Sequence, residues 1–131
     1  LVASKCDNVI TSGFEFTLPK PSYTVDTLKA LREKFPLHEF VLVIGADNWQ
    51  NFEKWKDWQE ILDKHNILVY PRIGSEIVIP DDLCNKVEKL DSPIIEISST
   101  YIREQLKKGK NMNFFLPKDV YRYILENNLY R

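Results

Sequence analysis

The sequence predicts an α/β fold with a mostly parallel sheet and flanking helices. Short apolar runs, at 40–44 and 67–70, alternate along the chain with stretches in which apolar residues recur at helical spacing. The run at 40–44 is apolar at every position, which is typical of a parallel strand covered on both faces. With 131 residues, the chain has room for one domain, over residues 1–131, around one hydrophobic core.

Four patterns in the first half of the chain predict regular elements. Residues 14–18 alternate enough to be a strand, which is followed by prolines. A helix is expected to begin at Ser22-Tyr23-Thr24 and to end at Pro36, because apolar residues fall on one face between them. The aromatic-rich stretch at 49–62 predicts a helix or tight turns that pack on the sheet, and the apolar run at 67–70 predicts the next strand.

The second half of the chain begins with a segment in which the spacing of apolar residues is weak. Residues 74–92 are polar, with a short strand expected at 77–79 and a helix at 80–90. A last strand is predicted at 94–97, and a helix opens directly after it at Ser98-Ser99-Thr100. The final helix is expected to start near Pro117, a residue favoured in the first helical turn.

Composition narrows the function classes. The net charge of −1 gives no general attraction to nucleic acid or to membranes, and no apolar run approaches the roughly 20 residues that span a bilayer. Cys6 and Cys84 lie far apart, as in a cytoplasmic protein with reduced thiols. The chain begins with Leu1 and its only methionine is Met112, so we expect it to be a piece of a longer protein. Homo-oligomerisation stays open.

Ile97-Ser98-Ser99-Thr100-x-x-Arg103 is the strongest chemical pattern. A strand that ends in hydroxyl residues and opens a helix offers free backbone N–H groups and the positive end of the helix dipole to an anion. Arg103, one turn inside, could bind phosphate oxygens with its guanidinium. The alternative is that Ser98 or Thr100 only caps the helix and that Arg103 is a surface residue.

Three further patterns could bind a ligand. Gly45-Ala46-Asp47 follows the buried strand, where Asp47 could accept hydrogen bonds from ribose or could cap the next segment. The hydroxyl-rich start at 22–24 could bind a carboxylate or phosphate, and aromatic residues of 49–58 could stack on a flat ring or form core. Arg72 follows a strand and could contact a phosphate. His38 and His65 are interpreted as structural.

Taken in this order, these patterns resemble the C-terminal portion of the bacterial nicotinate-nucleotide adenylyltransferases, which have a Rossmann-like nucleotidyltransferase fold. The motifs that carry the resemblance are Pro-Ser-Tyr-Thr-Val-Asp-Thr-Leu at 21–28, Ile-Gly-Ala-Asp at 44–47, Trp55, Arg72-x-Gly74, Ile-Ser-Ser-Thr-x-x-Arg at 97–103, Leu116-Pro117, and Tyr-Ile-x-x-x-x-Leu-Tyr at 123–130. Ile-Ser-Ser-Thr-x-x-Arg also occurs in phosphopantetheine adenylyltransferases, whereas the Ser-Tyr-Thr-x-Asp-Thr-Leu motif points to the nicotinate branch.

The resemblance implies transfer of adenylate from ATP to nicotinate mononucleotide, with Mg²⁺, giving nicotinate adenine dinucleotide and pyrophosphate in NAD biosynthesis. It implies that Asp47 contacts the ribose, that Thr24 binds the nicotinate carboxylate and that Trp55 stacks on the pyridine ring. The ATP-binding residues that it implies are Gly45, Asp47, Ile97, Ser98, Ser99, Thr100 and Arg103. Those implied for nicotinate mononucleotide are Tyr23, Thr24, Val25, Trp55, Lys56 and Arg72.

The sequence departs from the family in two ways. Lys56 stands where many members have an aromatic residue. The family's opening Gly-Gly-x-Phe-Asp-Pro-x-His-x-Gly-His segment, whose histidines act on the ATP phosphates, is absent from this chain. We therefore expect the chain to lack the first strand and helix of the fold, to hold no catalytic residue, and to be inactive or nearly so. The alternatives are a non-catalytic nucleotide-binding module, or an adenylyltransferase that uses phosphopantetheine or nicotinamide mononucleotide.

Overall fold

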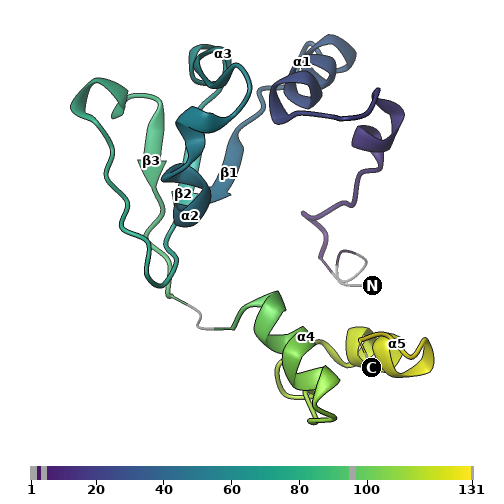
Figure 1. Cartoon of the computed structure of the whole chain (residues 1–131). Helices are drawn as coiled ribbons and strands as arrows, with labels where there is room; N and C mark the ends of the chain where they lie inside the picture. Colours follow the sequence, from purple (N-terminus) through teal and green to yellow (C-terminus); the bar gives the residue numbers. More distant parts are fainter. Residues whose placement is uncertain (1–2, 4–5, 95–96, 131) are drawn as a thin grey trace. The chain divides into compact units, whose positions relative to one another are not determined.

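The chain divides into two compact units, one of Gly13–Ile95 and one of Leu1–Ser12 with Glu96–Arg131. A computed structural model describes residues 3, 6–94 and 97–130. The first unit holds the sheet and the second holds the last two helices (Figure 1). None of the helices in the described part of the chain has both the length and the apolar surface that a membrane crossing requires. That residues 1–131 form one domain stays a prediction.

The sheet of the first unit has three parallel strands. They are β1 (Leu42–Gly45), β2 (Ile67–Tyr70) and β3 (Val87–Lys89), and β2 lies in the middle. Ile44 of β1 is in register with Val69 of β2, and Ile67 of β2 with Val87 of β3. The predicted parallel α/β arrangement is therefore confirmed, including strands within the apolar run 40–44 and at 67–70.

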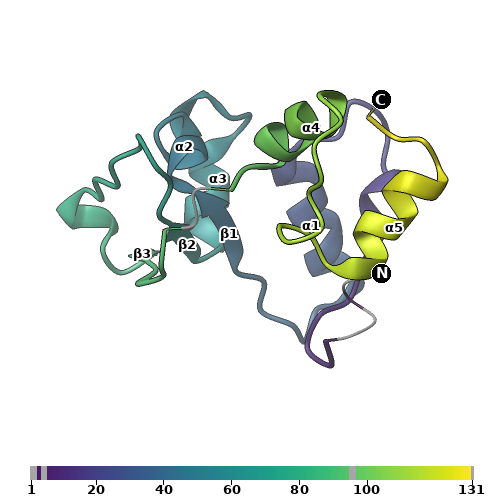
Figure 2. The ribbon, with the colours of Figure 1, turned by 90° about the horizontal axis from the view of Figure 1, so that it is seen from below.

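Three helices accompany this sheet. Helix α1 (Thr24–Lys34) packs on α3 (Trp58–Lys64), and the short α2 (Ala46–Trp49) follows directly from β1. Figure 2 shows the extended connection that leads from α1 to β1. The predicted helix between Tyr23 and Pro36 is confirmed. The aromatic stretch proves to be two helices joined by a 3₁₀ turn, η3 (Phe52–Lys54).

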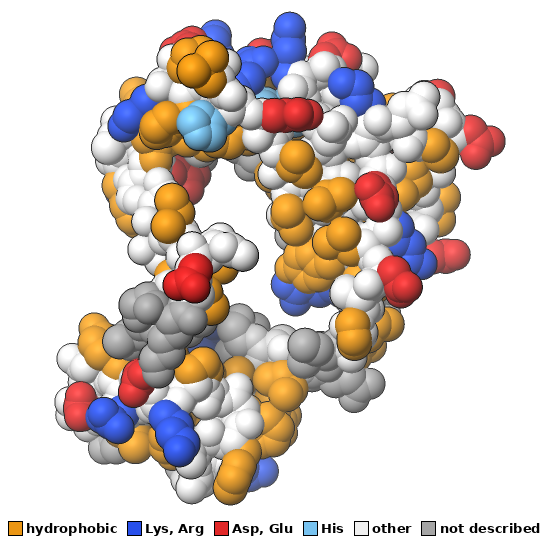
Figure 3. Space-filling view, turned by 180° about the vertical axis from the view of Figure 1, so that it is seen from behind, with side chains coloured by type: hydrophobic (Ala, Val, Ile, Leu, Met, Phe, Trp, Pro, Cys, Tyr) orange, Lys and Arg blue, Asp and Glu red, His pale blue; other side chains and the backbone are white. Residues whose placement is uncertain are grey.

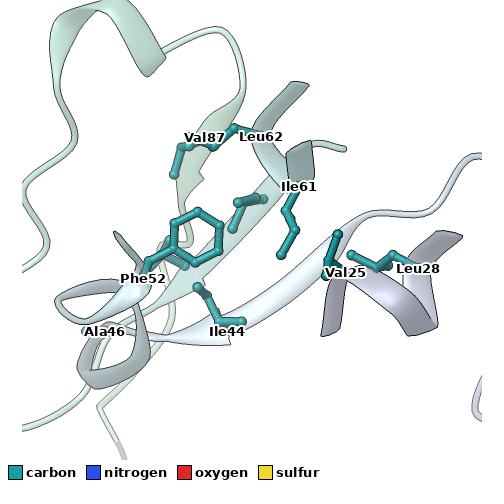
Figure 4. Close-up of a cluster of buried hydrophobic side chains, with 10 residues drawn as sticks. Val25, Leu28, Ile44, Ala46, Phe52, Ile61, Leu62 and Val87 are labelled. Atoms are coloured by element: carbon teal, nitrogen blue, oxygen red, sulfur yellow. The ribbon is translucent and has the colours of Figure 1, made fainter. Parts of the chain in front are cut away.

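Phe52 lies at the centre of the hydrophobic core. Its side chain is 2% exposed and lies among aliphatic residues of the strands and of α3 (Figure 4). Its ring is also in contact with three tryptophans, with ring centroids 5.4 Å from Trp49, 5.4 Å from Trp55 and 6.2 Å from Trp58. Phe52 is therefore core, and the three tryptophans are partly buried and pack against it.

The opposite face of the sheet is only partly covered. Val43 of β1 points away from the core and is 54% exposed, and Val41 just before the strand is 43% exposed. Figure 3 shows hydrophobic side chains gathered on the sheet-bearing unit, with charged groups at their border. The expectation of a strand covered on both faces is therefore wrong for the described residues, because the apolar run packs on one side only.

The second unit is built on two helices, α4 (Ser99–Lys107) and α5 (Lys118–Glu126). They lie side by side in Figures 1 and 2, and share a small core in which Leu106, Met112 and Ile124 are buried. Both helices confirm the prediction from the sequence.

Among the described residues, three predicted elements differ in the structure, and a fourth, at 94–97, is described only in part. Residues Phe14–Thr17 form a 3₁₀ turn, η2, because the Thr17 hydroxyl donates a 2.6 Å hydrogen bond to the Phe14 carbonyl and closes the turn locally. Residues 77–79 form no strand. The carbonyl of Val78 accepts instead from the Trp49 indole N–H at 2.8 Å.

The predicted helix at 80–90 is wrong as well. Only Asp81–Leu83 form a 3₁₀ turn, η4, and the chain then extends into β3. Val87 is 2% exposed, so burial of this side chain beside β2 favours a strand over a helix. Of the predicted strand 94–97, residues 95 and 96 lie outside the described residues, while Ile94 and Ile97 belong to no strand.

Candidate functional site

A cavity of about 250 Å³ lies at the start of α1, and we call it the α1 cavity. The segment before α1 and the segment after η3 line it: Ser22, Tyr23, Thr24, Lys54, Trp55 and Lys56. These segments are about thirty residues apart in the sequence. The structure thus brings together four of the residues implied for nicotinate mononucleotide, namely Tyr23, Thr24, Trp55 and Lys56.

The start of α1 is open to a ligand. Tyr23 is extended and precedes the first helical residue, Thr24, and the Tyr23 side chain makes no capping hydrogen bond to this helix end. The first N–H groups of a helix have no partner within the helix, and the dipole makes this end favourable for negative charge. An anionic group can therefore bind here.

Trp55 is held in place by the core. Its ring contacts Phe52 at 5.4 Å between centroids, and Phe52 is itself fixed by Trp49. The residue follows η3 and has extended backbone, so its side chain leaves the 3₁₀ turn beside Lys54 and Lys56. The Trp55 ring packs against the core and also lines the cavity. It can therefore stack on a flat ligand without a large loss of side-chain entropy.

Two lysines line the α1 cavity. The Lys56 ammonium donates to both Asp26 carboxylate oxygens, at 3.0 and 3.3 Å, and lies 4.7 Å from the centre of the Tyr23 ring. The hydrogen bond to Asp26, together with attraction to that carboxylate, raises the pKa of Lys56 above its ordinary value. The Lys54 ammonium donates to the neutral Asn51 side chain at 2.7 Å, so the charge of Lys54 is not neutralised by that partner.

A second group of polar side chains gathers where β1 and β2 end, and we call it the strand-end cluster. Arg72 Nε lies 3.3 Å from Asp47 Oδ1, and Arg72 Nη2 donates to the Tyr70 hydroxyl at 2.8 Å. This hydrogen bond, with attraction to Tyr70 and Asp47, raises the pKa of Arg72. Carboxyl ends of parallel strands are where α/β folds bind ligands.

Gly45 lets this cluster close over the end of β1. A Cβ atom at residue 45 would lie 2.5 Å from Asp47 Oδ1 and 2.9 Å from Arg72 Nε. The backbone of Gly45 is extended, with φ −77°, so the requirement is for space and not for an unusual backbone conformation. Gly45 therefore leaves the space in which the Asp47 and Arg72 side chains meet.

The start of α4 carries the hydroxyl pattern. The Ser98 Oγ accepts from the backbone N–H of Tyr101 at 3.0 Å, so the interpretation of Ser98 as an N-cap is confirmed. Arg103 donates to the Thr100 hydroxyl at 3.1 Å, one turn along the same helix. Ile97, Ser98, Ser99, Thr100 and Arg103 all belong to the second unit.

The structure also identifies residues that the sequence did not single out for a site. Lys54 lines the α1 cavity, Asp26 holds Lys56, and Tyr70 holds Arg72. The Lys-Trp-Lys sequence at 54–56 could have indicated the first of these. Arg72, implied for the mononucleotide, contacts Asp47 of the strand-end cluster instead of lining the α1 cavity.

The histidines agree with a structural interpretation. His65 is 4% exposed and its Nδ1 lies 2.9 Å from the Phe40 carbonyl oxygen. His38 contacts the rings of Phe35 and Phe40. The described residues contain no group of three or more His, Cys, Asp or Glu side chains placed to hold a metal ion.

Comparison with known proteins shows the family of this chain. Residues 2–105 match the family described as cytidylyltransferase-like. The chain belongs to this family. The probable nicotinate-nucleotide adenylyltransferase of Flavobacterium johnsoniae is 48% identical over 124 residues, which cover 92% of this chain and 63% of that protein. That of Bacteroides fragilis is 48% identical over 115 residues, 88% of this chain and 57% of the relative.

A solved structure agrees with the fold. The nicotinic acid mononucleotide adenylyltransferase of Plasmodium falciparum, in a complex with APC, superimposes with a TM-score of 0.67 at 22% identity, over 83% of this chain and 58% of that one. A complex of the same enzyme with NaAD gives the same score. The resemblance to the nicotinate-nucleotide adenylyltransferases and the Rossmann-like nucleotidyltransferase fold are therefore confirmed. The chain spans about six-tenths of the length of these relatives.

Proposed function

We propose that this chain forms the acceptor site and part of the ATP site of an enzyme that transfers adenylate from ATP to nicotinate mononucleotide. One observation carries the proposal above the others. The α1 cavity unites an uncapped helix start, a tryptophan held by the core, and lysine side chains. That combination suits a flat ring with a negatively charged substituent.

Each part of nicotinate mononucleotide has a counterpart in the α1 cavity. The pyridine ring stacks on Trp55, and its carboxylate accepts from the Thr24 hydroxyl and from N–H groups near Tyr23 and Val25. The helix dipole and the charge of Lys54 add to this attraction. In this proposal Lys56 takes part through its backbone and lines the cavity.

Each unit holds residues that the family resemblance assigns to ATP: the strand-end cluster in the first unit and the start of α4 in the second. Gly45 allows close approach of the nucleotide, and Asp47 accepts from the ribose hydroxyls. In the second unit, Ser99, Thr100 and Arg103 supply donors for phosphate oxygens through backbone N–H groups, hydroxyls and the guanidinium. Ile97 and Ser98 shape this turn. Mg²⁺ enters with ATP, carried by its phosphate oxygens, and neutralises charge on them.

The reaction requires positioning more than covalent chemistry. An oxygen of the mononucleotide phosphate attacks the α-phosphorus of ATP, and pyrophosphate leaves on the opposite side. Residues at the α1 cavity and at the strand-end cluster hold the two reactants in line, which replaces a bimolecular encounter by a reaction within one complex. Arg72, paired with Asp47 in the strand-end cluster, supplies a guanidinium for a phosphate of one of the reactants.

The experiment measures pyrophosphate release and nicotinate adenine dinucleotide formation, with ATP, Mg²⁺ and nicotinate mononucleotide. This chain is compared with the same chain preceded by a relative's Gly-Gly-x-Phe-Asp-Pro-x-His-x-Gly-His segment. Product from the longer chain alone is the expected result. Product from the short chain would contradict the need for the family histidines. Absence of product from both would overturn the enzymatic proposal in favour of a nucleotide-binding module.

A further inference from the structure

Asp26 occupies a position from which acidic side chains usually cap a helix. It is the third residue of α1, after Thr24 and Val25. An acidic or amide side chain at this position often turns back to accept from the backbone N–H of the cap residue, here Tyr23. Within the described part of the chain, Asp26 makes no such bond. Its carboxylate is held instead by Lys56, thirty residues further along, through two contacts of 3.0 and 3.3 Å.

The Asp26–Lys56 pair determines whether the Asp26 carboxylate or a ligand anion occupies the start of α1. Without Lys56, the Asp26 carboxylate would be free to turn toward the N–H groups of Tyr23 and of the first turn, and it would repel a second anion there. With Lys56 in place, the Asp26 carboxylate is paired with an ammonium group. The lysine is itself kept over the Tyr23 ring, 4.7 Å from its centre, and lines the α1 cavity together with Tyr23.

We propose that Lys56 is a positioning residue that keeps the start of α1 open for an acidic acceptor by holding Asp26 away from it. The inference rests on the proposed function, because it concerns the same cavity and names the substrate feature that the cavity selects. That feature is a ring carboxylate, as in nicotinate mononucleotide, in preference to the uncharged amide of nicotinamide mononucleotide. An amide depends little on the charge at the helix start, so Lys56 sets selectivity more than general affinity.

Lys54 takes no part in the Asp26–Lys56 pair. Its ammonium is bound to the neutral Asn51, whose own side-chain amide donates to the Asp47 carbonyl at 3.1 Å. Lys54 therefore attracts any anion, whether or not Asp26 is present. If Lys56 attracted the ligand directly, removing its charge would weaken binding whether or not Asp26 is present. If Lys56 acts by holding Asp26, removing its charge would weaken binding only while Asp26 is present.

The test is titration calorimetry of the chain with each mononucleotide, at low ionic strength where exposed charges are weakly screened. Three variants are compared with the wild type: Lys56→Met, Asp26→Asn, and the two together. Lys29→Met is the matched control, because Lys29 is an exposed lysine of the same helix that does not line the cavity.

For Lys56→Met we expect nicotinate mononucleotide to bind about five- to tenfold more weakly, the scale of one charge at a helix N-terminus. Nicotinamide mononucleotide should change less than about twofold, as should both ligands with Lys29→Met. Asp26→Asn alone should leave the acid form bound at least as tightly as in the wild type. In the double variant, affinity for the acid form should return to within about twofold of the wild type, because the competing carboxylate is gone.

Two outcomes overturn the inference. A double variant as weak as Lys56→Met would mean that Lys56 attracts the ligand directly. Equal weakening of both mononucleotides by Lys56→Met would mean that the ion pair only maintains the cavity wall. Failure of the wild-type chain to bind either mononucleotide is a different result, since it contradicts the proposed acceptor site itself.

Discussion

Replacing Phe52 by leucine tests how the core positions the α1 cavity. Phe52 is 2% exposed and its ring contacts all three tryptophans of the chain, with centroids 5.4 to 6.2 Å apart. Leucine keeps the side chain apolar but removes these ring contacts. At about 0.5–1.5 kcal/mol for each of the three aromatic pairs, the change should lower the free energy of unfolding by about 1.5–4.5 kcal/mol.

The assay is urea unfolding followed by tryptophan fluorescence, which reports the cluster directly because every tryptophan belongs to it. Phe16→Leu is the control, since Phe16 is 83% exposed and its replacement should change the free energy of unfolding by less than about 0.5 kcal/mol. Phe52→Leu should also weaken binding of nicotinate mononucleotide, because Trp55 loses the ring against which it packs. A Phe52→Leu chain as stable as Phe16→Leu would refute the assignment of Phe52 as the centre of the core.

Three further predictions follow from single contacts. Thr27→Val should raise the free energy of unfolding by about 1 kcal/mol in urea titrations, because the buried Thr27 hydroxyl has no hydrogen-bond partner among the described residues; a loss of stability would contradict this. Gly45→Ala should abolish ATP binding measured by calorimetry, since its Cβ would displace the Asp47 side chain, while the melting temperature stays nearly unchanged; unchanged ATP affinity would show that the strand-end cluster does not bind nucleotide. The Lys56 ammonium should titrate above pH 10.5 in NMR of labelled lysine, and Asp26→Asn should lower that pKa. Because the folded-state pKa is raised, the ion pair stabilises the fold below pH 10.5 and is lost as the pH rises through the higher value; no response to Asp26→Asn would contradict the pairing.

Elements with strong periodicity could be predicted from the sequence, and those that depend on tertiary contacts could not. The strand at 67–70 and the helix from Thr24 followed from apolar spacing alone. Residues 77–79 were predicted to form a strand because they are apolar, but the Val78 carbonyl accepts a hydrogen bond from the Trp49 indole N–H instead. The β3 strand, in turn, depends on burial of Val87 beside β2, which no local pattern in 80–90 reveals.

The candidate site shows the same division. Tyr23, Thr24 and Trp55 could be selected from ordered motifs, and the structure brings them to one cavity. The partnership of Asp26 with Lys56 joins residues thirty positions apart through side chains, so only the folded chain shows it. Arg72 could be selected as a phosphate contact, but its pairing with Asp47 depends on how β1 and β2 end side by side.

The most direct test of the acceptor site is a crystal structure of the chain with nicotinate mononucleotide bound. We expect the pyridine ring to stack on Trp55, with its carboxylate at the Thr24 hydroxyl and the first N–H groups of α1. A ligand bound elsewhere, or a nicotinate ring with its carboxylate turned away from α1, would contradict the account.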